Sequence, residues 1–534
     1  MDFIITKASP PIQQALQIIQ QSPIVEQLER LYRRSSRNEL IFIGTATFLT
    51  LYNLSSYIKT KCQKLNAPPT VPFSLPLIGH TLYTTFMPYK FLDWCDKRYG
   101  EIYNLHLLGQ TVTVANGKCG EETLKAERDD LSLEHGVVRD LLHLHYLFDD
   151  DGMEIAMQVN PYLLKKAVPN SRMRSLVPGI QRGLENAVHD LFHPSEPTII
   201  KEPSEFFQDY VAYMSVPTLV GDEAGTNIEV IKSFAAFTGD IIKNVGLFAA
   251  VPDRLHKYLM RFMTGTFKHH RVMEKHLGPI VREHREKMRQ AEEAGVPHGL
   301  EPTYLQLLIE WKKDDGVSGY TDKQICHALL SVAFASVHTT STNLLYCISW
   351  LIVRPDLKEQ LLEEIRRVSP GDKPVTYDEL QQMAFLNNFV REVLRQGTDP
   401  LATGKKAMRD YTYYNGYQVP KGRLVQTASR QLNFGTNSTR STIEEMDPTK
   451  SNNKTTTTPA RDYVAFGMGK HLCPGRFFAT QEIEMSLVYL LKNYDFNTVR
   501  NRKPYPITTI AGILNVNTQE PLIFTPKKKI HRGD

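Results

Sequence analysis

One cysteine near the end of the 534-residue chain sits between glycines at the start of a helical pattern. The stretch 466–476 reads FGMGKHLCPGR and contains Cys473. Gly469 allows a tight turn, and Gly475 allows the backbone to approach a flat group closely. Pro474 suits the first position of a helix, whose free N–H groups and positive dipole end would lower the pKa of the thiol. The pattern favours a thiolate presented to a metal over a core cysteine, the usual alternative.

This stretch resembles the haem-binding loop of the cytochrome P450 superfamily, whose pattern is Phe-x-x-Gly-x-basic-x-Cys-x-Gly. The five fixed positions are occupied by Phe466, Gly469, His471, Cys473 and Gly475. A motif gains weight from matches in register, and here every fixed position is met. The resemblance implies haem b, with Cys473 as axial ligand of the iron and the other four residues forming the cofactor site. His471 suits a carboxylate on the rim of the cofactor.

A long apolar helix is predicted over residues 321–350, and the segment 335–341 within it reads ASVHTTS. In the superfamily the central helix carries Ala/Gly-Gly-x-Asp/Glu-Thr-Thr, and Thr339 matches the threonine that helps to deliver protons. Ala335 leaves room for oxygen beside the helix. His338 replaces the usual acid, a variant that resembles fungal members, and histidine can relay protons near neutral pH. A ring hydrogen-bonded only to its surroundings is the alternative for His338.

A Glu-x-x-Arg pair, Glu392 and Arg395, would meet on one helix face. The superfamily joins this pair to the arginine of a Pro-x-Arg-Phe pattern in a buried structural network. Here that pattern falls on Pro448 and Lys450. Lysine lacks the planar fork of arginine, so the network is weaker or the pattern is displaced. The Ser/Thr/Asn-rich segment 451–459 is expected to be a flexible loop.

Weaker signals suggest further contacts to the carboxylates of the cofactor. Many members use a tryptophan and an arginine from an earlier helix, where the segment 160–166 offers lysines. Lys405 or Lys406 stands where an arginine is usual after the Glu-x-x-Arg helix. A lysine suffices there as a point charge.

The N-terminal part of the chain predicts attachment to a membrane. Residues 1–38 form a polar lead that is either a basic amphipathic helix on a membrane surface or a disordered tail. Residues 39–58 are assigned to a transmembrane anchor, with a buried core helix as the alternative. Residues 59–79 are basic and then Pro-rich, which predicts a stiff hinge. The catalytic domain is expected over residues 80–534.

Composition narrows the class of protein further. An apolar content of 41% and a charged content of 23% describe a globular protein with ample core. The net charge of +5 gives no argument for nucleic acid and would suit an anionic membrane or an acidic redox partner. Six cysteines without paired spacing argue against a disulfide framework and a structural zinc site, and they fit a reducing compartment.

Between the hinge and the long helix, the pattern predicts one β-hairpin followed by helices. Residues 102–115 alternate in polarity around Gly109, as in a hairpin. Residues 116–320 are mostly helical in pattern, and the densely charged run 269–293 predicts a solvated helix face. We therefore expect a mainly α fold.

The resemblance covers residues 68–527 and implies a triangular helical domain with small β-sheets behind a membrane anchor. It implies a monooxygenase that inserts one oxygen atom of dioxygen into a lipophilic, steroid- or terpenoid-like molecule, with fungal secondary metabolism as one setting. Electrons would come from NADPH through cytochrome P450 reductase, with cytochrome b5 as a further donor. A single-pass protein of the endoplasmic reticulum with a cytosolic catalytic domain is expected.

Two other classes of function stay open. One is a haem-thiolate isomerase, dehydratase or peroxide-using enzyme, against which Thr339 argues. The other is a non-catalytic haem-binding sensor, which would not consume NADPH with a reductase and an apolar substrate.

Overall fold

The computed structural model describes residues 65–527 apart from 77, 108, 244–247, 249, 250, 264, 436–445, 452, 453, 504–506, 511–513 and 518. The predicted polar lead and the predicted anchor, residues 1–38 and 39–58, lie outside the described residues. Among the helices that are described, none has both the length and the apolar character needed to cross a bilayer.

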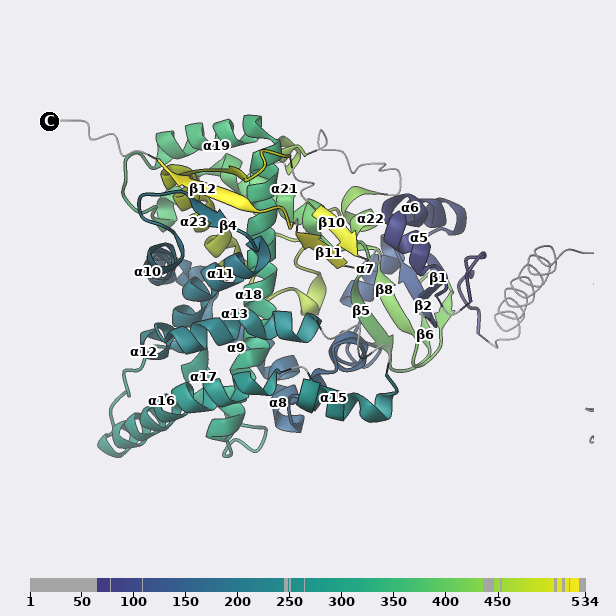
Figure 1. Ribbon diagram of the computed structural model, residues 1–534. Coiled ribbons are helices and arrows are strands. Elements are labelled where there is room, and N and C mark those ends of the chain that lie inside the picture. The colour runs from purple at the N-terminus through teal and green to yellow at the C-terminus, as the bar shows by residue number, and fades with distance from the viewer. Residues whose placement is uncertain are drawn as a thin grey trace, which may run out of the picture.

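Helix α18, Asp322–Val353, runs through the middle of the helix-rich part of the molecule (Figure 1). It begins with a capping box, in which Thr321 Oγ1 accepts from the Gln324 N–H and the Gln324 side chain accepts from the Thr321 N–H. From Ile325 onward most of its residues are buried. The helices packed around it are α11 (Pro203–Val220), α13 (Ile228–Ile242), α16 (Phe267–Ala294), α21 (Ala384–Gly397) and α23 (Arg476–Asn493). The long buried helix predicted over residues 321–350 is confirmed.

The remaining helices cover this core and connect it to the sheets. They are α5 (Thr81–Phe86), α6 (Pro88–Tyr99), α7 (Gly117–Lys125), α8 (Asp150–Glu154), α9 (Asn160–Ala167), α10 (Met173–Leu191), α12 (Asp222–Gly225), α15 (His256–Met263), α17 (Tyr304–Glu310), α19 (Pro355–Val368), α20 (Tyr377–Gln382) and α22 (Ser429–Phe434). Two segments are π-helical, η1 (Glu134–Leu141) and η3 (Ile155–Val159). Short 3-10 turns are η2 (Leu144–Tyr146), η4 (Asn170–Arg172), η5 (Asp253–Leu255), η7 (Pro448–Ser451) and η8 (Gly469–His471).

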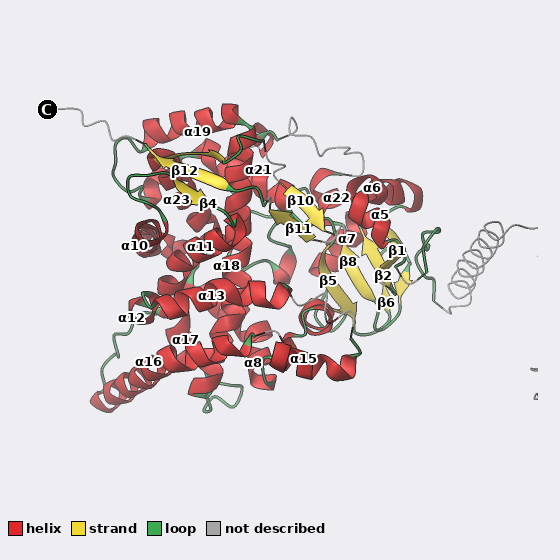
Figure 2. Cartoon of the chain, in the orientation of Figure 1, coloured by secondary structure: helices red, strands yellow, loops and turns green. Residues whose placement is uncertain are grey.

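A five-stranded sheet lies at one side of the helical core (Figure 2). Its strand order is β1 (Ile102–Leu107), β2 (Gln110–Ala115), β8 (Leu424–Thr427), β5 (Ala402–Ala407) and β3 (Leu131–Ser132). Strands β1 and β2 form the predicted hairpin, and Gly109 has a φ of 78° at its turn. The smaller sheets are β4 (Thr198–Ile200) with β12 (Leu522–Pro526) and β9 (Tyr494–Thr498), β6 (Tyr411–Thr412) with β7 (Gln418–Val419), and β10 (Ile507–Ile510) with β11 (Leu514–Asn517). The expected mainly α fold with small sheets is confirmed.

The described part of the predicted hinge lies along β1. The Asn104 N–H donates to Pro69 O at 2.8 Å, and Asn104 Nδ2 donates to Pro68 O at 2.9 Å. The Val71 N–H donates back to Asn104 O at 3.0 Å. These hydrogen bonds hold the segment against the edge of the five-stranded sheet. The domain boundary at residue 80 stays a prediction.

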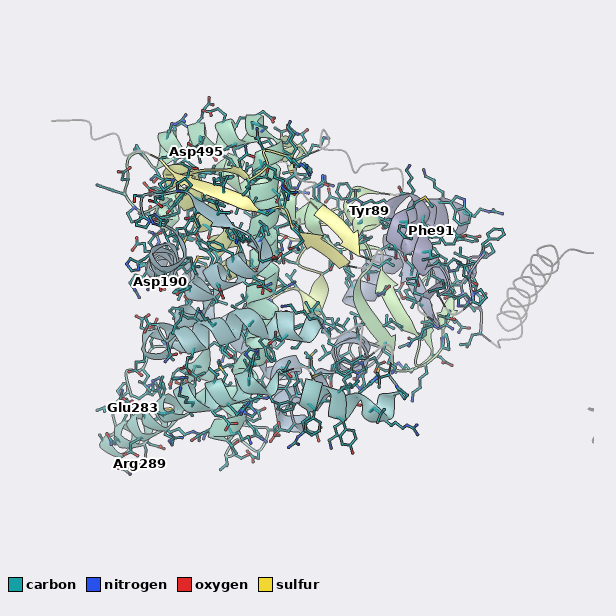
Figure 3. All side chains as sticks on the ribbon, in the orientation of Figure 1. Tyr89, Phe91, Asp190, Glu283, Arg289 and Asp495 are labelled. Carbon is teal, nitrogen blue, oxygen red and sulfur yellow. The ribbon has the colours of Figure 1, made fainter. Side chains whose placement is uncertain are left out.

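Helix α16 confirms the predicted charged face at its C-terminal end. Glu283 and Arg289 extend from its outer end (Figure 3). Lys287 Nζ lies 2.7 Å from Glu283 Oε1, and Arg289 pairs with Glu286 at 2.6 Å and Glu293 at 2.5 Å. Because these pairs are exposed, we expect each to contribute little to stability.

The first turns of α16 instead contain buried histidines. His270 is 3% exposed, and neither ring nitrogen has a hydrogen-bond partner among the described residues. Its ring centre lies 4.1 Å from that of His327 on α18, whose Nε2 lies 2.5 Å from Glu274 Oε1. Burial lowers the pKa of His270 to about 3, and the charges of His327, His269 and Lys323 act in the same direction. His270 is therefore a neutral ring where α16 packs on α18.

We predict that His270→Phe makes the fold more resistant to acid. Between pH 6.5 and about 3 the unfolded chain binds a proton at His270 and the folded chain does not, so stability falls as the pH falls through this window. The maximum contribution is about 5 kcal/mol. Phenylalanine keeps the ring contacts with Phe148 and Phe267 and removes the titration.

Circular dichroism from pH 7 to pH 3 should show the unfolding midpoint of His270→Phe at lower pH than that of the unmodified chain. His189→Gln is the control, because the His189 side chain is 87% exposed. Equal midpoints for all three proteins would contradict the prediction.

Candidate functional site

The loop that carries Cys473 is closed by a backbone hydrogen bond. The Cys473 N–H donates to Phe466 O at 2.9 Å, which brings the two ends of the motif together. Gly467 and Gly469 have φ values of 75° and 66°, in the left-handed region that favours glycine. A Cβ on Gly469 would also lie 3.2 Å from Lys125 Cγ. The tight turn predicted at Gly469 is confirmed.

Helix α23 begins directly after this loop. Its first residue is Arg476 and its N-cap is Gly475, so Pro474 precedes the cap. The expectation that Pro474 takes the first helical position is therefore wrong, because the helix starts two residues later. No heavy atom lies within 4 Å of the place that a Cβ on Gly475 would take. The backbone at Gly475 is therefore open to the close approach that the sequence suggests.

Cys473 differs from the other described cysteines in its exposure. It is partly buried, whereas the other four described cysteines are buried, and all five are free thiols. Withdrawal from water raises the pKa of Cys473, while the Gly475 N–H, the Arg476 charge and the Arg476 N–H act against this rise. The helix N-terminus therefore acts in the expected direction, but burial outweighs it, and the expected net lowering of this pKa is wrong for the protein alone. A metal ion at the sulfur would deprotonate the thiol.

Helix α18 is accessible to solvent near its middle. Between Ile325 and Val353, only Ala335 and Thr339 are exposed. Thr339 Oγ1 donates to Ala335 O at 2.8 Å, and Asn343 Nδ2 donates to Thr339 O at 2.8 Å. Ala335, Thr339 and Asn343 are spaced four residues apart and so share one helix face. The exposed face of this core helix thus contains two of the residues predicted for catalysis or cofactor binding.

His338 lies beside this face and is partly buried. Burial lowers the pKa of His338, which keeps the ring neutral at pH 7. Its carbonyl accepts from Ser341 Oγ at 3.1 Å. No hydrogen bond joins its ring to another residue in the described part of the chain. The alternative interpretation of His338, a ring that is only hydrogen-bonded to its surroundings, is therefore not supported by the structure.

The predicted pair of Glu392 and Arg395 is present on α21. Arg395 Nε and Nη2 donate to the two carboxylate oxygens of Glu392 at 2.8 and 2.7 Å. The remaining nitrogen, Nη1, donates to Asn433 O at 2.9 Å. Asn433 Oδ1 in turn accepts from the Val464 N–H at 2.9 Å, two residues before the Cys473 loop begins. Asn433 of α22 is therefore a further partner in this network.

Lys450 does not take the role expected of it. Its Nζ lies 3.7 Å from Asp447 Oδ2, and its side chain is 53% exposed. Each of the three guanidinium nitrogens of Arg395 already donates one hydrogen bond, to Glu392 or to Asn433. The structure corrects the sequence-based placement of Lys450 in the network.

Arg391, which the sequence analysis missed, connects α21 to the segment expected to be a flexible loop. Its Nη1 donates to Thr455 O at 2.6 Å and to Thr458 O at 2.9 Å, and its guanidinium carbon lies 3.6 Å from the ring centre of Tyr463. Asn387 Oδ1 accepts from the Thr456 N–H at 2.8 Å. The described part of this segment is therefore fixed by α21. The signal in the sequence that could have identified Arg391 is an arginine at a position of an amphipathic helix that faces the core.

The lysines proposed for the cofactor carboxylates are placed differently from one another. Lys405 is 1% exposed, and its Nζ donates to Leu124 O at 3.2 Å. Burial lowers the pKa of Lys405 to about 8, and burial followed by the charge of Lys405 lowers the pKa of His471. Lys406 instead pairs with Asp140 at 2.5 Å, and Lys166 lies over the exposed Tyr162 ring. Lys405 and His471 are thus neighbouring basic groups beside the Cys473 loop.

We predict that Arg391→Met destabilises the fold far more than Lys450→Ala. Removal of the buried Arg391 guanidinium leaves the Thr455 and Thr458 carbonyls without their donor, at a cost of about 2–4 kcal/mol. Removal of the exposed Lys450 ammonium should change stability by less than about 0.5 kcal/mol. Thermal unfolding followed by circular dichroism compares the two variants. If Lys450→Ala loses as much stability as Arg391→Met or more, the prediction is contradicted and Lys450 is part of the structural network.

Comparisons with known proteins show the family of the chain. Residues 68–524 match the family model described as "Cytochrome P450". "Cytochrome P450 monooxygenase atmQ" of Aspergillus flavus is 28% identical over 319 residues, which are 57% of this chain and 58% of that protein. "Cytochrome P450 monooxygenase paxQ" of Penicillium paxilli is 26% identical over 306 residues, 55% of this chain and 57% of that protein.

These two matches span little more than half of each relative. A match along nearly the whole chain is the "Eburicol 14-alpha-demethylase" of Uncinula necator, 22% identical over 537 residues, which are 93% of this chain and 98% of that protein. The family model itself matches far more than half of the chain and includes both the Cys473 loop and the exposed face of α18. The chain therefore belongs to the cytochrome P450 family.

Proposed function

We propose that this chain is a haem-thiolate monooxygenase that inserts one atom of dioxygen into a lipophilic substrate. The observation that carries the proposal is Cys473, the one partly exposed thiol among the described cysteines, in a closed loop at the start of α23. Helix α23 packs on α18, whose middle is accessible at Ala335 and Thr339. A thiol ligand and an accessible polar helix face are what this chemistry needs from a protein.

The residues present fit haem b, the cofactor of this family. Cys473 supplies one ligand, so the remaining ligands of an iron must come with the cofactor, as they do in a porphyrin. Lys405 and His471 are basic groups suited to its carboxylates, and Phe466, Gly469 and Gly475 form the loop around the sulfur. When bound, the haem supplies the redox chemistry that activates dioxygen.

Thr339 and His338 would manage protons beside the cofactor. Because Thr339 Oγ1 donates to Ala335 O, its lone pairs remain available to accept a hydrogen bond from water. The neutral ring of His338 has one nitrogen that donates and one that accepts, and it can pass a proton between them. Ala335 keeps the face open because its side chain is small.

The substrate class rests on two relatives that match along most of the chain. They are named as 14-alpha-demethylases of eburicol and of lanosterol. The second is a protein of Cunninghamella elegans that is 22% identical over 86% of this chain. We infer a steroid- or terpenoid-like substrate for this chain. Electrons would come from NADPH through cytochrome P450 reductase, with cytochrome b5 as a further donor. Residues 39–58 would anchor the protein in the endoplasmic reticulum membrane, with the catalytic domain in the cytosol.

The first test is the carbon monoxide difference spectrum of the reduced holoprotein. The unmodified chain should show the strongly red-shifted Soret band of thiolate-ligated haem, and Cys473→Ala should lose that band completely. Cys347→Ala is the matched control, because Cys347 is a buried cysteine of α18. The proposal fails if Cys473→Ala retains the band.

We predict that Thr339→Ala binds haem normally and diverts electrons to hydrogen peroxide. Without the hydroxyl, proton delivery slows, and product formed per NADPH consumed should fall by about tenfold or more. Thr340→Ala is the matched control, because the Thr340 side chain is buried on the neighbouring face of α18.

Peroxide and NADPH are measured with a reductase and lanosterol as the first candidate substrate. A larger loss of coupling in Thr340→Ala than in Thr339→Ala would contradict the assignment. Turnover without any NADPH consumption would instead favour the isomerase, dehydratase or peroxide-using class.

A further inference from the structure

Arg476, the first residue of α23, connects the candidate iron ligand to a distant loop. Its Nη1 donates to Cys473 O at 2.9 Å, and its Nε donates to Thr457 O at 3.2 Å. Its guanidinium carbon lies 4.2 Å from the ring centre of Phe477. The planar fork of arginine sets its N–H donors in fixed directions, and here two of them hold carbonyls in different segments at once.

The loop at the other end of this connection is itself fixed. Arg391 donates to the carbonyls of Thr455 and Thr458, which flank Thr457 on either side. Arg391 lies on α21, a helix that packs directly on α23. The carbonyl that accepts from Arg476 is therefore held by a rigid helix, and so the position of the Cys473 peptide is set relative to α21 as well as α23.

The charge of Arg476 is not neutralised by a carboxylate among the described residues. Its hydrogen-bond partners are two neutral carbonyls. Because these partners are neutral, they do not cancel the electrostatic field of the Arg476 charge, and this field acts on Cys473 three residues away. The other cation of the loop, Lys470, pairs with Glu127 at 2.6 Å and faces solvent.

We propose that Arg476 is a positioning residue for the iron ligand, which fixes the Cys473 peptide against the loop at Thr457 and sets the reduction potential of the bound haem through its charge. This inference rests on the proposed function. A nearby positive charge favours the state of the haem that carries the additional electron. Loss of the charge should therefore lower the potential.

The test is a spectroelectrochemical titration of purified holoprotein variants. Arg476→Gln keeps a donor for Cys473 O and removes the charge. We expect the ratio of reduced to oxidised haem at a fixed potential to fall by about tenfold, which for one electron is about 59 mV. Arg476→Lys keeps the charge and loses the fork, so its potential should stay near that of the unmodified protein.

Arg461→Gln is the matched control. Its side chain is 86% exposed and pairs with Glu121, so screening by solvent should leave the potential unchanged. Equal potentials for Arg476→Gln, Arg461→Gln and the unmodified protein would overturn the proposal. If Arg476→Gln does not retain haem, the potential of Arg476→Lys is the deciding measurement. This variant keeps the positive charge, so a potential well below that of the unmodified protein would overturn the role of the charge.

The two proposals fail in different ways. Absence of the thiolate-type carbon monoxide band in the unmodified protein would overturn the proposed function itself. A normal band in the unmodified protein together with unchanged potentials in the Arg476 variants would overturn the role of Arg476 alone.

Discussion

The bidentate pair of Arg395 and Glu392 is the interaction on which the geometry of the site depends. Glu392 holds two nitrogens of the guanidinium, so the third points at Asn433 O, and Asn433 accepts from the Val464 N–H just ahead of the Cys473 loop. A buried ion pair contributes little net stability, since both charges must be desolvated. Its consequence here is positional, because it fixes α22 and the approach to the loop relative to α21.

The features that the sequence predicted correctly depend on local chemistry. The long helix over residues 321–350 begins at a capping box and continues through an apolar pattern, and both signals lie within the segment itself. The hairpin over residues 102–115 follows from alternation around one glycine. The turn at Gly469 follows from a backbone conformation that other residues adopt at a cost. None of these needs knowledge of a distant partner.

The incorrect predictions for Lys450 and for the segment 451–459 concern partners that only the fold brings together. Lys450 was placed in the network by its match to the Pro-x-Arg-Phe pattern, whereas the acceptor for Arg395 comes from Asn433. The Ser/Thr-rich composition of the segment 451–459 suggested a flexible loop. In the structure Arg391 donates hydrogen bonds to two carbonyls of this segment and fixes it. Lys405 and Lys406 show the limit most clearly, because neighbours on a strand point to opposite faces. Which one turns inward depends on the register of β5, which shifts between Ala402 and Lys405.

The exposed face of α18 shows how a core helix can serve a site at small cost. Exposure of a large apolar side chain at mid-helix would forfeit about 1.5–3 kcal/mol of burial. The exposed positions are instead a small residue, Ala335, and a polar one, Thr339, while the adjacent Val337 is fully buried. Asn343 continues this stripe one turn further on. A narrow stripe of small and polar residues at a spacing of four, inside an otherwise apolar helix, therefore leaves one face open at little cost in burial.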